Sequence, residues 1–550
     1  MADYDVQTQR EGRWMTETTC LDEQGARDTA KRLFANKACV GVRIMRVTLR
    51  PDRTAVETEI HCETRTVKLD ESIRIAPIDS APPPCATIDD YYGAASRNVI
   101  GRILRTYCDK IVVTPTELLY DVKENKRLQD RDTLVPNAVE KVAALQTKGA
   151  EADAKARASE MLKSLEAIGS RARKAEKLNL PRIKDSFSEA VSALYGIETM
   201  GEDVEYLAMV VLARDLAGCR NWLGKLARLC RLAEAEIDPA ALAKLDGALS
   251  DVLTGSVVQD VLGDQRNLAQ AIICMVDLAE GTMAIDLSEA REIAAILNTL
   301  LASGRMPACR QTLLERAHRQ LASTAPLNRI DPSKEEDEYK RVVARLLKPT
   351  GLYSGPETAE ALTDRYARMV VKGGVSGRQA AIDGVFATLP DRATAVLYLC
   401  DLARTGYAKD CAPKIAEKFD TILNTRSFAD MTGRNTEPKE RMRRLSQAHR
   451  AILASVFPKP VKQRLADHLD TLFERHLVQD KVIDRLDSGP VRDRAVRLTQ
   501  FCASGMLPDG RTRALVRARL TALLAQPDFE AQFGDGLRDF RQMLAKTGLA

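Results

Sequence analysis

The chain has 550 residues, of which 82 are basic and 77 acidic, so its formal net charge is only +5. Such a small excess over so long a chain argues against a nucleic-acid-binding protein that acts through overall charge. Apolar residues make up 45% and charged residues 29%, a balance that excludes wholesale disorder. Because aromatic residues are only 5%, we expect helices packed through small aliphatic side chains, in about two to four domains.

The twelve cysteines form no C-x-x-C pair, and several fall on apolar helical faces. This usage is typical of reduced, buried thiols rather than of a disulfide framework. No secretory signal is visible at the amino terminus, and no run approaches the roughly 18–20 apolar residues of a membrane span. We therefore expect a soluble, cytoplasmic protein.

Residues 1–76 have the alternating pattern of a small α+β module. One hairpin is predicted over residues 4–20 with its turn at Glu11-Gly12, and a second over residues 42–60 with its turn at Pro51-Asp52. Between them, a helix from about Asp22 to Asn36 carries apolar residues at spacings of three and four. The order ββαββ predicts an antiparallel sheet with one helix laid across it. A docking or sensing role and a plain structural role both fit this module.

A proline-rich linker is predicted at 77–86, because consecutive prolines cannot continue a helix. Beyond it nearly everything is predicted to be helical. We divide this part into a connector at 87–182 and three helical repeat or bundle units at 183–335, 336–435 and 436–550. Within the connector, residues 150–180 predict a long exposed helix with Met161, Leu162 and Leu165 on its apolar side. The fold class is therefore mainly α, with an N-terminal α+β module.

The division rests on a phrase, Ala-Ser-Gly-x-x-Pro-x-x-Arg, that occurs at 302–310 and at 503–511, with a weaker version at 404–407. Aligning Gly304, Gly406 and Gly505 superimposes the apolar stripes of the preceding helices. We interpret the glycine as a helix C-cap and structural joint, and the serine, proline and arginine as dispensable. The implied period is about 100 residues, so each unit would hold several helices. The alternative is that Ala/Leu/Arg-rich helices joined at glycine resemble one another by chance.

No motif predicts catalytic, cofactor-binding or metal-binding residues. The five histidines include His468 and His476, which on one helix would lie about 12 Å apart along its axis, too far to share a metal. The loop at Gly373-Gly374 lacks the G-K-[S/T] ending of a phosphate-binding loop and follows a predicted helix rather than a strand. We expect no cofactor.

One basic stretch could face an acidic partner such as RNA or a membrane surface. Its residues are Lys439, Arg441, Arg443, Arg444, Arg450, Lys462 and Arg464. An apolar stripe runs through the same stretch, and aromatic residues do not interleave with the charges. A solvated helix face is therefore the favoured interpretation.

The predicted function follows from architecture alone. Arrays of helical repeats present extended surfaces, so the first hypothesis is a non-catalytic cytoplasmic interaction or scaffold protein with protein partners. Nucleic acid and a membrane span are not expected, and a homo-oligomer is left open. The alternative is a ligand-responsive regulator that binds a small molecule or nucleotide. The third is an enzyme whose site does not show in the sequence.

Overall fold

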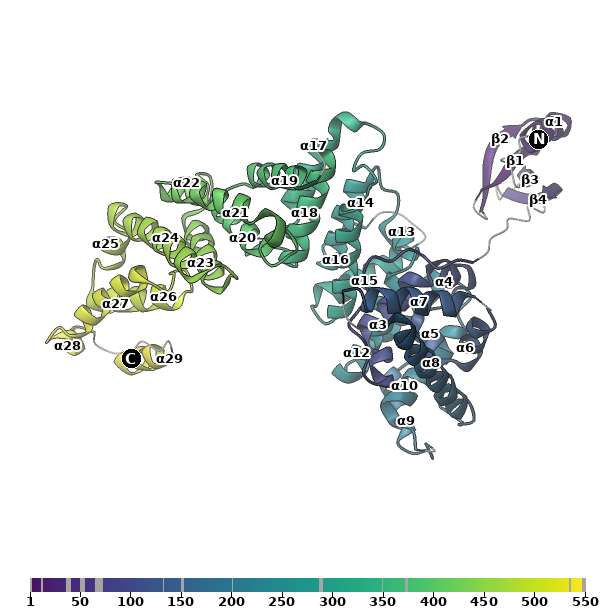
Figure 1. The fold of residues 1–550 in the computed structure, drawn as a ribbon, viewed down its shortest axis with the longest axis horizontal. Coiled ribbons are helices and arrows are strands. Elements are labelled where there is room, and N and C mark those ends of the chain that lie inside the picture. The colour runs from purple at the N-terminus through teal and green to yellow at the C-terminus, as the bar shows by residue number, and fades with distance from the viewer. Residues whose placement is uncertain are drawn as a thin grey trace. The chain divides into compact units, whose positions relative to one another are not determined.

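The structure is a computed structural model, and it describes residues 2–10, 13–35, 41–49, 55–64, 73–131, 133–149, 153–199, 201–285, 290–348, 350–370, 374–533 and 536–546. The chain forms two compact units, Met1–Arg74 and Ile75–Ala550. Helices make up 69% of it, and the described residues contain 29 α-helices and a small N-terminal antiparallel sheet. The predicted fold class is confirmed (Figure 1).

The N-terminal unit is the predicted ββαββ module. Its elements are β1 (Ala2–Arg10), β2 (Arg13–Cys20), α1 (Glu23–Ala35), β3 (Gly41–Leu49) and β4 (Ala55–Thr64). The sheet order is β2-β1-β3-β4, with every neighbouring pair antiparallel. Both predicted turns lie outside the described residues.

Alternation along the strands and the helical period of α1 build the core of this unit. Val6 pairs with Ile44 across β1 and β3, and both are fully buried. Ala26 and Ala30, four residues apart on α1, are buried in the same cluster. Their small side chains let the helix lie close to the sheet.

The helical unit begins with eleven helices in its amino-terminal part. These are α2 (Ile88–Tyr92), α3 (Ala94–Ile103), α4 (Arg105–Ile111), α5 (Pro115–Tyr120), α6 (Val122–Gln129), α7 (Leu134–Gln146), α8 (Ala154–Glu176), α9 (Phe187–Leu194), α10 (Val204–Ala217), α11 (Trp222–Ala235) and α12 (Pro239–Leu253). The middle part holds α13 (Val257–Leu262), α14 (Leu268–Ala279), α15 (Arg291–Ala302), α16 (Pro307–Leu321), the 3₁₀ turn η1 (Pro332–Lys334), α17 (Glu335–Arg345), α18 (Pro356–Met369), α19 (Gly374–Thr388) and α20 (Arg392–Leu402).

The carboxyl-terminal part continues as helices. They are α21 (Tyr407–Leu423), α22 (Phe428–Thr432), α23 (Pro438–Ala454), α24 (Lys459–Gln479), α25 (Val482–Leu486), α26 (Val491–Ala503), α27 (Arg511–Leu524), α28 (Phe529–Phe533) and α29 (Leu537–Lys546). A two-stranded ladder, β5 (Leu347–Lys348) with β6 (Gly351–Leu352), interrupts the helices after α17. One continuous cluster of buried apolar residues runs from Tyr91 to Leu544. None of the helices in the described ranges is both long and apolar enough to cross a membrane.

Side-chain caps begin several helices of this unit. A capping box begins α5: Glu117 accepts from the Thr114 backbone N–H at 2.8 Å, and Thr114 Oγ1 accepts from the Glu117 N–H at 3.2 Å. At α12, Asp238 accepts from the Ala241 N–H at 2.9 Å. Both caps satisfy backbone donors that a helix leaves free at its first turn.

The proline-rich segment 77–86 is held against the helical unit. Ile78 is buried, and the backbone N–H of Ala76 donates to the carbonyl of Ile103 at 2.8 Å. The side-chain amide of Gln146 donates to the carbonyl of Pro82 at 2.9 Å. The segment therefore packs against α3 and α7.

The division of the helical unit into parts at 87–182, 183–335, 336–435 and 436–550 stays a prediction.

The long helix α8 differs from the prediction. It packs along α7, and its buried face carries Met161, Ile168, Ala172 and Ala175. Leu162, which the sequence led us to place on the apolar side, is 43% exposed. The charge-rich composition suggested a solvated helix, but alanines and a glycine provide a narrow face that packs closely.

Candidate functional site

The three predicted joints all contain a side-chain hydroxyl that makes the same hydrogen bonds, whereas the conformation of the glycine differs among them. Gly304 and Gly505 have φ of 71° and 68°, the left-handed region, but Gly406 has φ of −57°. At each joint the preceding residue bonds back to a carbonyl three residues earlier: Ser303 to Leu300 at 2.6 Å, Thr405 to Leu402 at 2.8 Å and Ser504 to Phe501 at 2.7 Å. The same hydroxyls accept from the backbone N–H two residues on, at 3.2–3.3 Å. The interpretation of the serine as dispensable stays a prediction, and these bonds make Ser303 and Ser504 the residues on which to test it.

Two of the joints are completed by a buried carboxylate from another helix. Asp246 on α12 accepts from the N–H groups of Ala308 and Cys309 at 2.7 and 2.9 Å, at the start of α16. Asp470 on α24 does the same for Arg511 and Thr512, at 2.6 and 3.0 Å, at the start of α27. A carboxylate at this position caps the helix and favours its dipole. These two carboxylates therefore hold α12 to the start of α16 and α24 to the start of α27.

The predicted basic surface is largely engaged within the protein. Arg443 pairs with Glu440, Arg444 with Asp391 and Glu440, and Arg464 with Asp420. Arg450 donates to the carbonyl of Gly505 at 2.7 Å, and Lys462 to that of Leu453 at 3.2 Å. The Nε of Arg441 is buried, and Lys439 is exposed. Five of these seven residues thus have partners in the chain, mostly between helices, and the set does not form one free cationic face.

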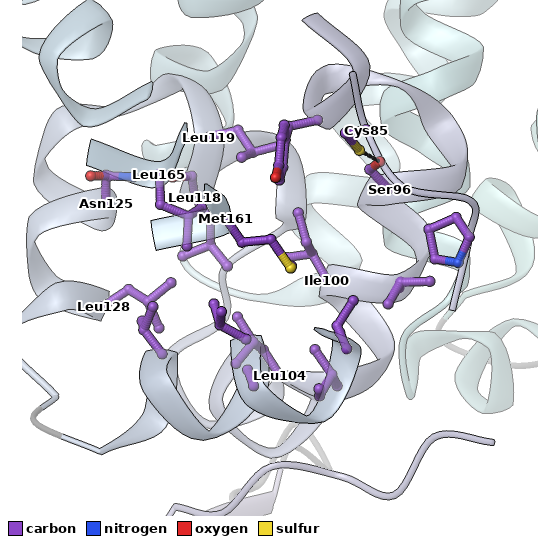
Figure 2. Close-up of a pocket in the computed structure, with 18 of the residues that line it drawn as sticks. Cys85, Ser96, Ile100, Leu104, Leu118, Leu119, Asn125, Leu128, Met161 and Leu165 are labelled. Carbon is purple, nitrogen blue, oxygen red and sulfur yellow. Dashed lines mark hydrogen bonds between the residues drawn. The ribbon is translucent and has the colours of Figure 1, made fainter. Parts of the chain in front are cut away.

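The amino-terminal part of the helical unit contains an apolar cavity of about 110 Å³ that the sequence did not predict (Figure 2). Side chains from α2, α3, α5, α6, α7 and α8 line it, together with Pro82 and Cys85. Figure 2 shows apolar side chains around the space, among them Ile100, Leu104, Leu118, Leu128, Met161 and Leu165. The apolar residues at these positions are those of any helical core. No sequence signal separates a helix that faces a void from one that faces a neighbour.

Polar groups lie at two sides of this cavity. On one side Arg157 donates to the side-chain oxygen of Gln146 at 3.0 Å and pairs with Glu160 at 3.0 Å. Near them the sulfur of Cys85 is 3.4 Å from the hydroxyl of Ser96. Asn125 lies on the other side in Figure 2, and its amide donates to the carbonyl of Leu118 at 3.0 Å. The lining between them is apolar.

A buried ion pair fixes the helix α5, which contributes Leu118 and Leu119 to the cavity. Lys225 on α11 donates to the carboxylate of Glu117, and each side chain is only 1% exposed. Burial raises the pKa of Glu117, and Lys225 and the Thr114 cap oppose this shift. The pair joins the capping box of α5 to α11.

A cleft of about 670 Å³, lined by tyrosine, charged and small apolar side chains, lies beside α2, α3 and α5. Consecutive residues divide between the two spaces: Tyr91 lines the cavity and Tyr92 the cleft, and Leu119 lines the cavity and Tyr120 the cleft. The rings of Tyr92 and Tyr120 are 4.7 Å apart, and Tyr206 contacts both. Burial raises the pKa of Tyr92 to about 12, so its phenol is neutral at physiological pH.

The charges of the cleft are paired with one another. The guanidinium of Arg171 stacks 3.8 Å from the centroid of Tyr206 and pairs with Asp89, Glu202 and Asp203 at 2.7–3.0 Å. At the back, Arg97 pairs with Asp251 at 2.9 Å, and both are buried. This network holds α2, α3, α8, α10 and α12 together.

Across the part of the chain that the structure describes, no group of three or more His, Cys, Asp or Glu side chains could hold a metal ion. In the glycine-rich loop, Gly373 lies outside the described residues, and Gly374 is the first residue of α19.

No protein-family model, no curated protein and no solved structure matches this chain.

Proposed function

We propose that the protein is a ligand-responsive regulatory protein that binds a small, apolar molecule in the cavity of its helical unit. The observation that carries this proposal is the apolar space of about 110 Å³ between six helices. Voids in protein interiors are costly, because their lining atoms lose contacts that a ligand can restore. A cavity of about 150 Å³ lined by Leu, Ile and Phe is known to stay dry and bind benzene. The space in this protein is smaller, so it suits a slightly smaller ligand, or one of that size if the helices move apart slightly.

The position of the cavity in the chain supports a regulatory role. Pro82 and Cys85 line it, and they follow shortly after the boundary between Arg74 and Ile75. A bound ligand would therefore contact the segment that leads out of the N-terminal unit. Occupancy of the cavity could change how firmly the segment with Pro82 and Cys85 packs on the helices. A ligand shifts such an equilibrium when it binds the packed and the released state with different affinities.

We place the proposed regulator in a reducing compartment, the cytoplasm. The eleven cysteines among the described residues are all free thiols. Burial raises the pKa of Cys108 and of Cys230 to about 12, so these two thiols are protonated and unreactive.

The test is ligand-dependent stability of the full chain. Toluene at ten times its dissociation constant should raise the unfolding free energy by about 1.4 kcal/mol, measured by chemical denaturation. The variant Ala138→Leu places extra atoms in the cavity from α7 and should remove this stabilisation. Mass spectrometry of an organic extract of natively purified protein should then identify the natural ligand. The proposal fails if no compound in a panel of small apolar molecules stabilises the wild type, or if Ala138→Leu responds equally.

A second proposal, a scaffold that binds protein partners through an array of helical units, is favoured by the joints. The shared hydroxyl bonds at Ser303, Thr405 and Ser504 support repeated helix pairs, which present extended surfaces. Affinity purification from native cells, with size-exclusion chromatography, should recover a specific partner or a homo-oligomer. A lone monomer with no specific partner would contradict this role.

A further inference from the structure

One wall of the apolar cavity is made by a segment that is neither helix nor strand. Pro82 and Cys85 line the cavity, and both belong to the proline-rich segment 77–86, which we call the strap. Almost all of the other lining residues lie on helices. The consecutive prolines keep the strap out of the helices, because proline has no N–H to donate. Figure 2 labels Cys85 beside Ser96 at this wall.

Side chains of α7 and α8 hold the middle of the strap. The side-chain amide of Gln146 donates to the carbonyl of Pro82 at 2.9 Å. Arg157 donates to the side-chain oxygen of Gln146 at 3.0 Å and, more weakly, to the carbonyl of Cys85 at 3.5 Å. The two prolines that follow Pro82 are exposed. Two carbonyls thus attach the middle of the strap to the helices, and Gln146 makes the shorter of the two bonds.

Both ends of the strap are fixed more firmly than its middle. Near its start, Ile78 is only 2% exposed. At its other end, the carboxylate of Asp90 accepts from the N–H groups of Ala86 and Thr87 at 2.8 and 2.7 Å, which ties the strap to the first turn of α2. The middle of the strap can therefore lift while both ends stay in place.

The helical walls of the cavity are harder to open. The helix α7 buries Leu134, Val139 and Val142, and α8 buries Met161 and Ile168. Moving either helix outward would expose this apolar surface to water, which is unfavourable in proportion to its area. Lifting the strap breaks hydrogen bonds whose groups then bond to water, so the loss is smaller. Local opening takes place where the fewest buried contacts are lost.

We propose that the strap is the gate of the cavity. Its middle lifts to admit and release a small apolar ligand, and Gln146 closes the gate by bonding to the carbonyl of Pro82. This inference rests on the proposed function and adds how exchange of the ligand at the same site is controlled.

The test follows the exchange of fluorobenzene between solution and the full chain by fluorine NMR. Fluorobenzene has the same number of heavy atoms as toluene, and its fluorine reports the free and bound states directly. The variants are Gln146→Met and Gln129→Met, since methionine keeps the length of glutamine and removes its amide. Gln129 is a matched control, because it also lines the cavity, but from α6, and its amide donates to Asn125 at 3.0 Å.

A second variant loosens the strap without changing the lining. Pro83→Gly combined with Pro84→Gly replaces two exposed prolines that do not line the cavity, and glycine gives the strap more backbone freedom. Circular dichroism confirms that each variant folds.

Gln146→Met should raise both the association and the dissociation rate of fluorobenzene about tenfold and change Kd by less than about threefold, because a hydrogen bond that closes the gate is lost in the free and the bound state alike. The double glycine variant should raise both rates as well, and Gln129→Met should leave them near the wild-type values.

Two results would overturn the gate and leave the apolar-ligand proposal standing. One is that fluorobenzene binds but exchanges at the wild-type rates in both Gln146→Met and the double glycine variant. The other is that Gln129→Met raises the rates as much as Gln146→Met, which would indicate a general loosening of the cavity walls. If fluorobenzene does not bind the wild type, the proposed function itself is refuted.

Discussion

Replacing Lys225 by methionine leaves the carboxylate of Glu117 without its cation in a fully buried position. Methionine matches the length of the lysine stem, so the packing of α11 is preserved while the charge is lost. Each side chain of the pair is only 1% exposed. Removing one partner of such a buried pair typically costs about 3–5 kcal/mol, because the remaining charge is uncompensated. We expect Lys225→Met to lower the unfolding free energy by an amount in this range at pH 7.

The penalty should depend on pH. Burial already raises the pKa of Glu117 above its ordinary value of 4.5, and Lys225 is the largest opposing influence, so the variant raises the pKa further. Between the folded-state pKa of the wild type and that of the variant, the difference in unfolding free energy grows by about 1.36 kcal/mol for each pH unit. A raised folded-state pKa costs stability as pH rises, so the deficit of the variant should be smaller at pH 5 than at pH 7.

Urea denaturation of wild type and variant at both pH values measures this change. The variant Lys244→Met is the control, because Lys244 pairs with Glu205, whose side chain is 69% exposed, and its loss should cost less than about 1 kcal/mol. Adding Glu117→Gln to Lys225→Met should restore much of the lost stability, since the buried charge is then absent. A deficit in Lys225→Met that is equal at pH 5 and pH 7 would refute the reasoning.

Two further predictions concern the joints and a buried histidine. Gly505→Ala should lower the unfolding free energy by about 1 kcal/mol because its φ is 68°, and Ser504→Ala by a similar amount through its two lost hydrogen bonds. Gly406→Ala should be within about 0.5 kcal/mol of wild type, since its φ is −57° and a Cβ there meets nothing within 4 Å; equal losses for both glycines by urea denaturation would contradict this. Burial lowers the pKa of His318 from 6.5 to about 4, so stability should be complete above pH 6.5 and fall by up to about 3 kcal/mol towards pH 4. His318→Gln should flatten that part of the stability profile, and an unchanged slope would show that other groups cause it.

The sequence predicted the features that depend on neighbours in the chain. Alternation identified β1 to β4, because it depends on residues a few positions apart. Features that depend on distant residues did not show. The cavity arises from the combined packing of six helices, and the carboxylates of Asp246 and Asp470 cap helices that begin 61 or 41 residues later.

The joints show that residues of the same type at aligned positions can have different structural roles. Gly406 aligned with Gly304 and Gly505, yet its conformation differs, whereas Thr405 replaced serine and kept both hydrogen bonds. Alignment by residue identity favoured the glycine. The physical element common to all three joints is a hydroxyl that bonds to the end of the preceding helix.

The most direct test of the apolar cavity is a crystal structure of the full chain under xenon pressure, since xenon binds dry apolar cavities without hydrogen bonds. We predict an anomalous peak between Ile100, Leu118 and Met161 in the wild type, and its loss in Ala138→Leu. A cavity filled by ordered water, or closed by the side chains of α7 and α8 with no xenon bound, would contradict the account.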